Sequence, residues 1–538
     1  MAFDVPEWCE TGRGDRPVLL VAPHGGRRPP IDAACPPPQL RVNDLYTADM
    51  TRELAQRLGA GFIINHWLDR NQLDLNRISQ VRRHAVWFLH LLADAVGEVV
   101  RRCGLVEIVF VHGWNTGQLK CDIGIGGSER AGRLHVPDGS RCTVAAPYID
   151  MRIARLRAAC AQRGIACTLG ARYSGGHRNN LLQLFSARGL EVDHPDARRI
   201  GSWATAGRLN AFQLELSIPL RWPGAARTLF VEAMDAAFAA EPDTRARSTA
   251  CARLPQGGNA QDSALSTRDS PAALQFYDPI ADVGMVAGVG RTSGATLAGR
   301  LLLFLGGQRV ALFTGEEAAH MHAVPPLSCR HERGELRVDF NGTMLLLDDA
   351  AVYLDLEAAL AASRMIEVDL QARFQPLAGT AAAGAAQFGA ADGSLRIGGR
   401  AREIRAGAFA NAAAFRAVGS SRQTMLAAAF GMERAVLSHA SDDPDRCVSV
   451  HFNCTETGTL DAARINVTTS GDAYTPATFE LSSARHPPLR GEVRSRMSIL
   501  RPSADGGYLR VTFGVAGFEW GGQRGYGLYE HAQPLHRK

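Results

Sequence analysis

The chain has 538 residues, more than one ordinary hydrophobic core supports, so we expect two or three domains. Hydrophobic residues make up 46% and charged residues 21%, the balance of a soluble globular protein. A net charge of +5 over this length, with no segment that interleaves basic and aromatic residues, argues against a nucleic-acid partner. No run of about 18 apolar residues is present, so we expect no membrane span.

The cysteines and the first residues indicate the compartment. Eleven cysteines occur without a C-x-x-C pair, and their odd number favours reduced thiols. The first residues contain neither the basic nor the apolar segment of a secretory leader. We therefore expect a cytoplasmic protein.

The first half of the chain alternates short apolar runs with helical patterns. The strand-like runs are 17–22, 61–68, 106–113, 165–171 and 211–218, and the helical patterns are 47–58, 79–103, 148–163 and 225–240. Strands that alternate with helices predict an α/β domain over 1–240, with a mostly parallel sheet covered by helices on both faces.

The composition changes after residue 240. Residues 241–273 are polar and rich in Gly, Pro and Ser, which is typical of a linker. Residues 274–538 consist of short strand candidates, including 351–358, separated by Gly, Asn and Asp turns, which predicts an all-β barrel or sandwich. The Ala-rich stretch 379–391 is predicted to be a loop or a short helix.

Three side chains suited to metal chemistry follow or end separate strands of the first domain. They are His24, His112 and Glu215. In an open α/β sheet, ligands bind outside the carboxyl ends of the strands, so these residues can converge there. Catalytic zinc keeps three protein ligands and one water, and a carboxylate that is not a ligand can take a proton from that water.

Seven short segments carry a resemblance to a known family. They are PHGG (23–26), NDLYTADMTRELA (43–55), LDRNQLDLNR (68–77), VHGWN (111–115), DIGIGG (122–127), YSGGH (173–177) and QLELS (213–217). Over about residues 15–240, the chain resembles the N-formylglutamate amidohydrolases, relatives of the zinc carboxypeptidases and aspartoacylase. The resemblance implies a zinc carboxypeptidase-like fold, with His24 and His112 as zinc ligands and Glu215 as the general base.

The third zinc ligand is open at this point. Zinc carboxypeptidases use H-x-x-E, but residue 27 here is Arg. The resemblance points instead to an acidic residue about twenty positions after the first histidine, and Asp44 fits that place. Asp49 and Glu53 are the fallbacks, and Asp44 has the alternative of capping a helix.

The resemblance also implies how a substrate is held. Arg77 would bind a substrate carboxylate or the developing oxyanion, with Asn76 beside it, and Arg70 would be a second anion contact. An alternative for Arg77 is a structural ion pair. The predicted substrate loop is YSGGH, with Tyr173, Gly175 and Gly176 as the binding residues. No role is assigned to Gln213 and Arg221.

The second half carries a weaker resemblance. The segments 368–376, 392–409 and 518–531 resemble the lipocalin-type double barrel of tocopherol cyclase and carotenoid hydratase relatives. Those relatives would have an aspartate and tryptophans where this chain reads REIRAGAFA (402–410). Glu530 and His531 are therefore this domain's only candidates for chemistry, and the barrel could hold one small hydrophobic ligand.

The sequence thus predicts a two-domain zinc-dependent amidohydrolase. The expected substrate is an N-formyl or N-acyl amino acid, or a similar small amide with a carboxylate. The alternative is a metabolite-binding or tailoring protein, in which the barrel captures a lipophile or acts like a cyclase or hydratase. In that case the first domain is a non-catalytic scaffold.

Overall fold

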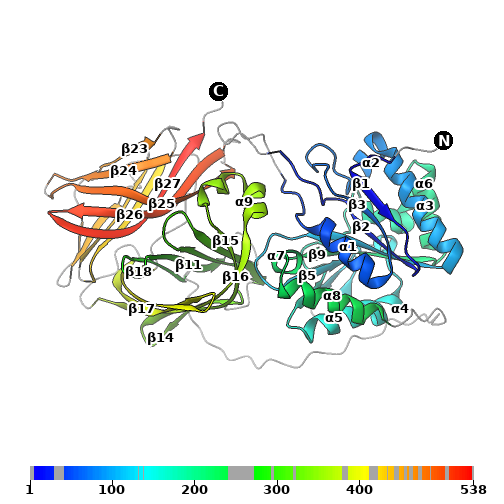
Figure 1. The fold of residues 1–538 in the computed structure, drawn as a ribbon, viewed down its shortest axis with the longest axis horizontal. Coiled ribbons are helices and arrows are strands. Elements are labelled where there is room, and N and C mark those ends of the chain that lie inside the picture. Colours follow the sequence, from blue (N-terminus) through cyan, green and yellow to red (C-terminus); the bar gives the residue numbers. More distant parts are fainter. Residues whose placement is uncertain are drawn as a thin grey trace. The chain divides into compact units, whose positions relative to one another are not determined.

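The structure, a computed structural model, separates into two compact units (Figure 1). The described residues of the first unit are 5–29, 41–130, 133–136 and 139–239. Those of the second are 272–291, 296–318, 323–377, 386–410, 422–432, 434–441, 448–453, 457–459, 464–470, 475–484, 486–502 and 508–535. The predicted linker, 241–273, lies outside the described residues except for its last two.

The first unit is built on a mixed seven-stranded sheet in the order β1-β3-β2-β4-β9-β5-β8. Its strands are β1 (Cys9–Gly12), β2 (Val18–Ala22), β3 (Gly61–Asn65), β4 (Val106–Gly113), β5 (Lys120–Gly124), β8 (Ala166–Leu169) and β9 (Leu209–Leu216). Four of the six pairings are parallel, and β1/β3 and β5/β9 are antiparallel. The α/β class predicted for this half is confirmed.

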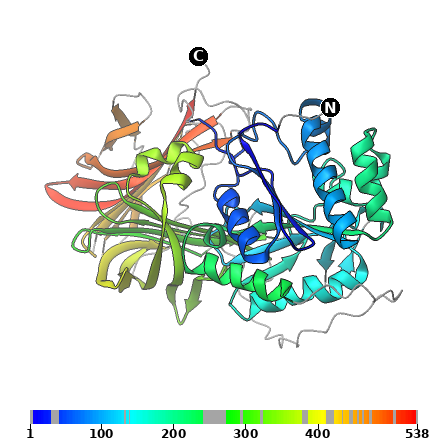
Figure 2. The same ribbon diagram turned by 45° about the vertical axis from the view of Figure 1, so that its right-hand side comes forward.

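Helices cover both faces of this sheet (Figures 1 and 2). One apolar core joins the sheet to α1 (Thr47–Leu58), α5 (Ala154–Ala161) and α8 (Ala225–Phe238). A second core joins the other face to α3 (Val86–Cys103) and α6 (Pro195–Thr205). The smaller elements are α2 (Ile78–His84), α4 (Ala146–Tyr148), α7 (Ile218–Arg221), β6 (Ser128–Arg130) and β7 (Arg133–His135).

The single helix predicted over 79–103 is wrong. It is two helices, α2 and α3, separated at Ala85, whose φ of −140° and ψ of 51° are not helical. The apolar periodicity continues across the break, because residues of both helices bury their apolar side chains in the same core. Periodicity alone therefore does not reveal the break.

The second unit is β-rich, as predicted, and its described strands pair antiparallel in two nine-stranded sheets. The first has the order β13-β12-β11-β10-β18-β17-β16-β15-β14, and the extra pairing of β13 with β15 curls it on itself. Its strands are β10 (Ala272–Asp278), β11 (Val283–Arg291), β12 (Thr296–Phe304), β13 (Val310–Ala318), β14 (Leu327–Glu332), β15 (Glu335–Leu347), β16 (Arg364–Pro376), β17 (Gln387–Ile397) and β18 (Arg400–Ala410). Packed Leu, Val, Phe, Ala and Met side chains from these strands form its core.

The second sheet of this unit has the order β22-β21-β20-β19-β27-β26-β25-β24-β23. Its strands are β19 (Gln423–Phe430), β20 (Arg434–Ser441), β21 (Val448–Asn453), β22 (Thr457–Thr459), β23 (Arg464–Ser470), β24 (Thr475–Ser482), β25 (Leu489–Pro502), β26 (Tyr508–Trp520) and β27 (Gln523–Leu535). An apolar core that includes Phe304 and Phe513 joins the two sheets.

Two local predictions for this unit are wrong. The strand predicted at 351–358 is a 3-10 turn followed by helix α9 (Leu356–Ala362), because the Asp355 side chain caps that helix by accepting from two backbone amides. In the Ala-rich stretch, residues 387–391 are strand rather than loop or helix. Pairing with β16 and β18 on both sides overrides the helical propensity of alanine there.

Two further expectations, reduced cysteines and the absence of a membrane span, concern the whole chain. All seven cysteines in the described part of the chain are free thiols. No helix among the described residues is both long and apolar enough to cross a membrane.

Candidate metal centre

Three ligand-type side chains meet beyond the carboxyl ends of β2 and β4. His24 follows β2, His112 lies near the end of β4, and Asp44 precedes α1. One nitrogen or oxygen from each lies within 4.8 Å of the others, and all three residues are buried. The two imidazole centroids are 5.1 Å apart. The structure thus brings together the three residues predicted as metal ligands.

The hydrogen bonding of His24 leaves one of its nitrogens for a cation. Its Nε2 lies 2.7 Å from Asp74 Oδ1, and because a carboxylate only accepts, Nε2 is the donor. In a neutral ring, Nδ1 then carries a lone pair, and it lies 3.2 Å from Asp44 Oδ2, which also carries lone pairs. A cation, either a proton or a metal ion, is needed between these two atoms.

His112 approaches the same oxygen from another strand. Its Nδ1 lies 3.2 Å from Asp44 Oδ2. Its buried Nε2 has no hydrogen-bond partner among the described residues. Burial lowers the pKa of His112, although the hydrogen bond with Asp44 opposes the shift. The ring is therefore kept in the neutral form that metals require.

The charge of Asp44 completes the set. Although burial opposes ionisation, the charge of Arg70 and the hydrogen bond with His112 hold the pKa of Asp44 well below its ordinary value. Two neutral imidazoles and one carboxylate suit zinc, and this donor set leaves a position for water. The residues present therefore fit the predicted metal.

The alternatives to Asp44 are engaged elsewhere. Asp49 is paired with Arg52 at 2.8 Å, and Glu53 accepts from Arg227 at 2.7 Å. The capping alternative for Asp44 is also wrong, because α1 begins at Thr47 and its N-cap residue is Tyr46, which makes no side-chain cap bond.

Sequence reasoning missed Asp74, the first residue of the DLNR segment. Only 1% of its surface is exposed, and it holds His24 in place. Burial opposes ionisation here too, but the hydrogen bond with His24 and the charge of Arg70 hold the pKa of Asp74 well below its ordinary value. A histidine ligand whose other nitrogen donates to a carboxylate is a common arrangement at zinc sites. The sequence feature that could have indicated Asp74 is the DLNR segment, of which it is the first residue.

The predicted general base, Glu215, lies in a row with two other site residues. In the pairing of β4 with β9, His112 is directly beside Glu215, and in the pairing of β5 with β9, Asp122 is its neighbour on the other side. Paired residues project from the same face of a sheet. Burial raises the pKa of Glu215 well above its ordinary value, and the charges of Asp44 and Asp122 add to the shift.

The arginines predicted to bind anions surround the two aspartates. Arg70 Nη1 lies 3.1 Å from Asp44 Oδ1, and Arg77 Nε lies 3.5 Å from Asp74 Oδ2. Arg41 also donates to Asp74 at 2.8 Å. Arg77 is thus in an ion pair, yet its side chain is one-third exposed, at 33%. The buried Oδ1 of Asn76 has no partner among the described residues.

The predicted substrate loop lies next to Glu215. Gln213, which had no assigned role, donates from Nε2 both to the Tyr173 carbonyl (3.1 Å) and to Glu215 Oε1 (3.3 Å). Burial and the charge of Glu215 raise the pKa of Tyr173. Packing within the unit explains why these two positions are glycine. A Cβ on Gly175 would lie 2.6 Å from Leu182, and one on Gly176 would lie 2.8 Å from the Gly126 carbonyl.

Arg221, the other residue without an assigned role, is fully buried. It donates to the carbonyl of Leu45 at 2.8 Å and to Asn115 Oδ1 at 2.9 Å. Burial lowers its pKa to about 10, against the charges of Asp44 and Glu215. Arg221 therefore fixes the backbone next to Asp44.

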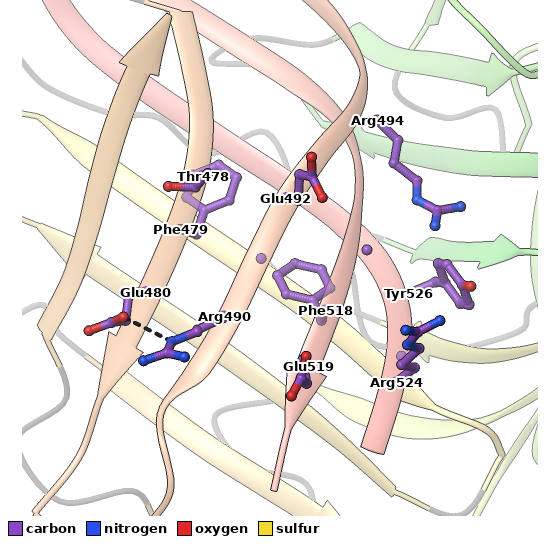
Figure 3. A pocket seen from close by; sticks show the side chains of 13 residues that line it. Thr478, Phe479, Glu480, Arg490, Glu492, Arg494, Phe518, Glu519, Arg524 and Tyr526 are labelled. Carbon is purple, nitrogen blue, oxygen red and sulfur yellow. Dashed lines mark hydrogen bonds and ion pairs between the residues drawn. The ribbon is translucent and has the colours of Figure 1, made fainter. Parts of the chain in front are cut away.

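In the second unit, His531, a candidate for chemistry, is buried rather than exposed to solvent. It is 2% exposed and its Nδ1 lies 2.9 Å from the Thr424 hydroxyl, while the other candidate, Glu530, is 8% exposed. A hollow of about 580 Å³ lies elsewhere, over β24 to β27 (Figure 3). Its charged lining residues are Glu480, Arg490, Glu492, Arg494, Glu519 and Arg524. This lining is not the apolar one expected around a hydrophobic ligand, and such a ligand stays a prediction.

Comparison with known proteins gives distant structural likenesses. No family model and no curated protein matches the sequence. N-formylglutamate amidohydrolase from Ralstonia eutropha JMP134 is 13% identical, with a TM-score of 0.29 over 43% of this chain and 95% of that chain. Kievitone hydratase from Nectria haematococca is 12% identical, with a TM-score of 0.31 over 49% and 88%.

A third solved structure, a protein assigned as AttH from Nitrosomonas europaea, is 10% identical, with a TM-score of 0.32 over 48% of this chain and 90% of that chain. None of these TM-scores reaches 0.5, so we base the function on the residues of the site.

Proposed function

We propose that the first unit is a zinc-dependent hydrolase that cleaves the amide bond of an N-formyl or N-acyl amino acid, or of a similar small amide with a carboxylate. The observation that supports this most directly is the convergence of His24, Asp44 and His112 within 4.8 Å. When bound, zinc would lower the pKa of a water molecule and polarise an acyl carbonyl.

The remaining tasks belong to the chain itself. Glu215 lies beside His112, so it is suited to accept a proton from water and to return it to the leaving nitrogen. Burial raises the pKa of Glu215 well above its ordinary value, which makes its carboxylate a stronger base. Arg77, with its guanidinium partly exposed, is suited to bind a substrate carboxylate or the developing negative charge.

The test is metal content and hydrolysis of the full chain. We expect about one zinc per chain, formate release from N-formyl amino acids that a chelator abolishes, and loss of both zinc and hydrolysis in His24→Ala and His112→Ala. Glu215→Gln should keep zinc and lose hydrolysis. His66→Ala is the matched control, since His66 is exposed and its ring is hydrogen-bonded to the Glu7 carbonyl.

Wild-type protein that takes up no zinc, or His112→Ala with unchanged zinc content, would overturn the proposal. A full chain that binds lipophiles tightly and hydrolyses no amide would favour the alternative, a binding or tailoring protein.

A further inference from the structure

We infer that Asp122 is a positioning residue, which fixes the turn formed by residues 171–173 and so holds Tyr173 next to the general base. The inference rests on the proposed function for its kinetic consequence, but not for its structural one. Asp122 lies on β5, is fully buried, and had no assigned role.

The Asp122 carboxylate accepts four hydrogen bonds, all from residues 168–173. Its Oδ1 accepts from the Thr168 hydroxyl (2.7 Å) and the Ala171 amide (3.0 Å). Its Oδ2 accepts from the amides of Arg172 (2.9 Å) and Tyr173 (2.8 Å). Three consecutive backbone amides, which belong to no helix or strand, thus depend on one side chain.

The turn is also connected to the site. Gln213 links the Tyr173 carbonyl to Glu215, because its single amide group donates to both. The Tyr173 ring packs edge-on against Trp114, two residues after His112, with centroids 5.9 Å apart. Asp122 itself is the cross-strand neighbour of Glu215. A change at Asp122 therefore displaces the turn, and with it the Tyr173 ring beside the base.

Asparagine is the informative replacement. Its amide keeps only one acceptor oxygen. With the NH₂ group toward Thr168, the Thr168 hydroxyl can accept from it and the Ala171 amide loses its acceptor; in the other orientation, the Arg172 and Tyr173 amides lose theirs. Thr168→Val is the matched control, since it removes a donor to the same carboxylate and leaves all three amide bonds in place.

The experiment is amide hydrogen exchange of the full chain over residues 170–174, together with zinc content and steady-state kinetics on N-formyl-L-glutamate. We expect the three turn amides to be protected in wild type, although they lie outside the sheet. In Asp122→Asn at least one of them should exchange about tenfold faster or more, with zinc retained. KM should rise about tenfold or more and kcat should change less, whereas Thr168→Val should resemble wild type.

Wild-type turn amides that exchange as fast as an exposed loop would overturn the inference, even if Asp122→Asn does not fold. So would a folded Asp122→Asn protein with wild-type exchange and KM. If wild type hydrolyses no N-formyl amino acid, the proposed function fails, while the exchange rates still decide the role of Asp122.

Discussion

Asp74 offers the sharpest test of the metal centre, because it touches a proposed ligand without being one. Removing its carboxylate in Asp74→Ala leaves the Nε2 of His24 without its 2.7 Å partner in a buried site. The ring then loses the hydrogen bond that fixes its orientation. Arg41, Arg70 and Arg77, which the carboxylate partly neutralises, would also add repulsion toward a cation.

Loss of such an outer partner weakens metal affinity about 10- to 100-fold, which is about 1.4–2.8 kcal/mol. We expect the upper end for Asp74→Ala. Asp74→Asn should lie near the lower end, since an amide oxygen still accepts from Nε2 but carries no charge. The assay is competitive zinc titration against a chromophoric chelator, with circular dichroism to verify the fold.

Asp49→Asn is the control for this series. Asp49 is also a carboxylate near the site in sequence, but it is exposed on α1 and forms an ion pair with Arg52. Its removal should leave zinc affinity unchanged. If folded Asp74→Ala binds zinc within about twofold of wild type, while His24→Ala does not bind, the proposed orientation of His24 by Asp74 is wrong.

Three further predictions concern stability. Burial lowers the pKa of His531 to about 4. Between pH 6.5 and this value the unfolded chain takes up a proton at His531 while the folded chain does not. The free energy of unfolding should therefore fall by about 2 kcal/mol between pH 7.5 and pH 5. Urea unfolding should show this, and His531→Gln should remove that part of the pH dependence; an unchanged slope would contradict it. Arg221→Met should lower the free energy of unfolding by about 2–3 kcal/mol and weaken zinc binding, because the Leu45 carbonyl beside Asp44 loses its donor. Unchanged thermal stability would argue against a role of Arg221 in fixing this backbone. Phe340→Ala should cost about 3–5 kcal/mol, because its ring is 1% exposed and packs on Phe313 with centroids 5.0 Å apart. Calorimetry should show this loss of stability, and an unchanged transition would contradict the packing role.

Local patterns in the sequence were sufficient for the regular elements of the first unit. The helix predicted over 47–58 and the strand over 106–113 match α1 and β4, since each has the apolar period of its element and a face to bury. Position in the chain was also sufficient to select His24, His112 and Glu215, because residues at the ends of parallel strands share one edge of the sheet. Their binding of zinc stays a prediction.

Only the tertiary structure decided the partners of these residues. Strand β5, with Lys120, Cys121 and Asp122, has no strand-like alternation of apolar residues, and it exists because β8 and β9 pair with it on both sides. Asp74 meets His24 across 50 residues, and Asp122 meets the 171–173 turn across about 50. Hydrophobic periodicity reports which face of an element is buried. It carries no information on which polar groups meet across the fold, and those encounters determine the chemistry of this site.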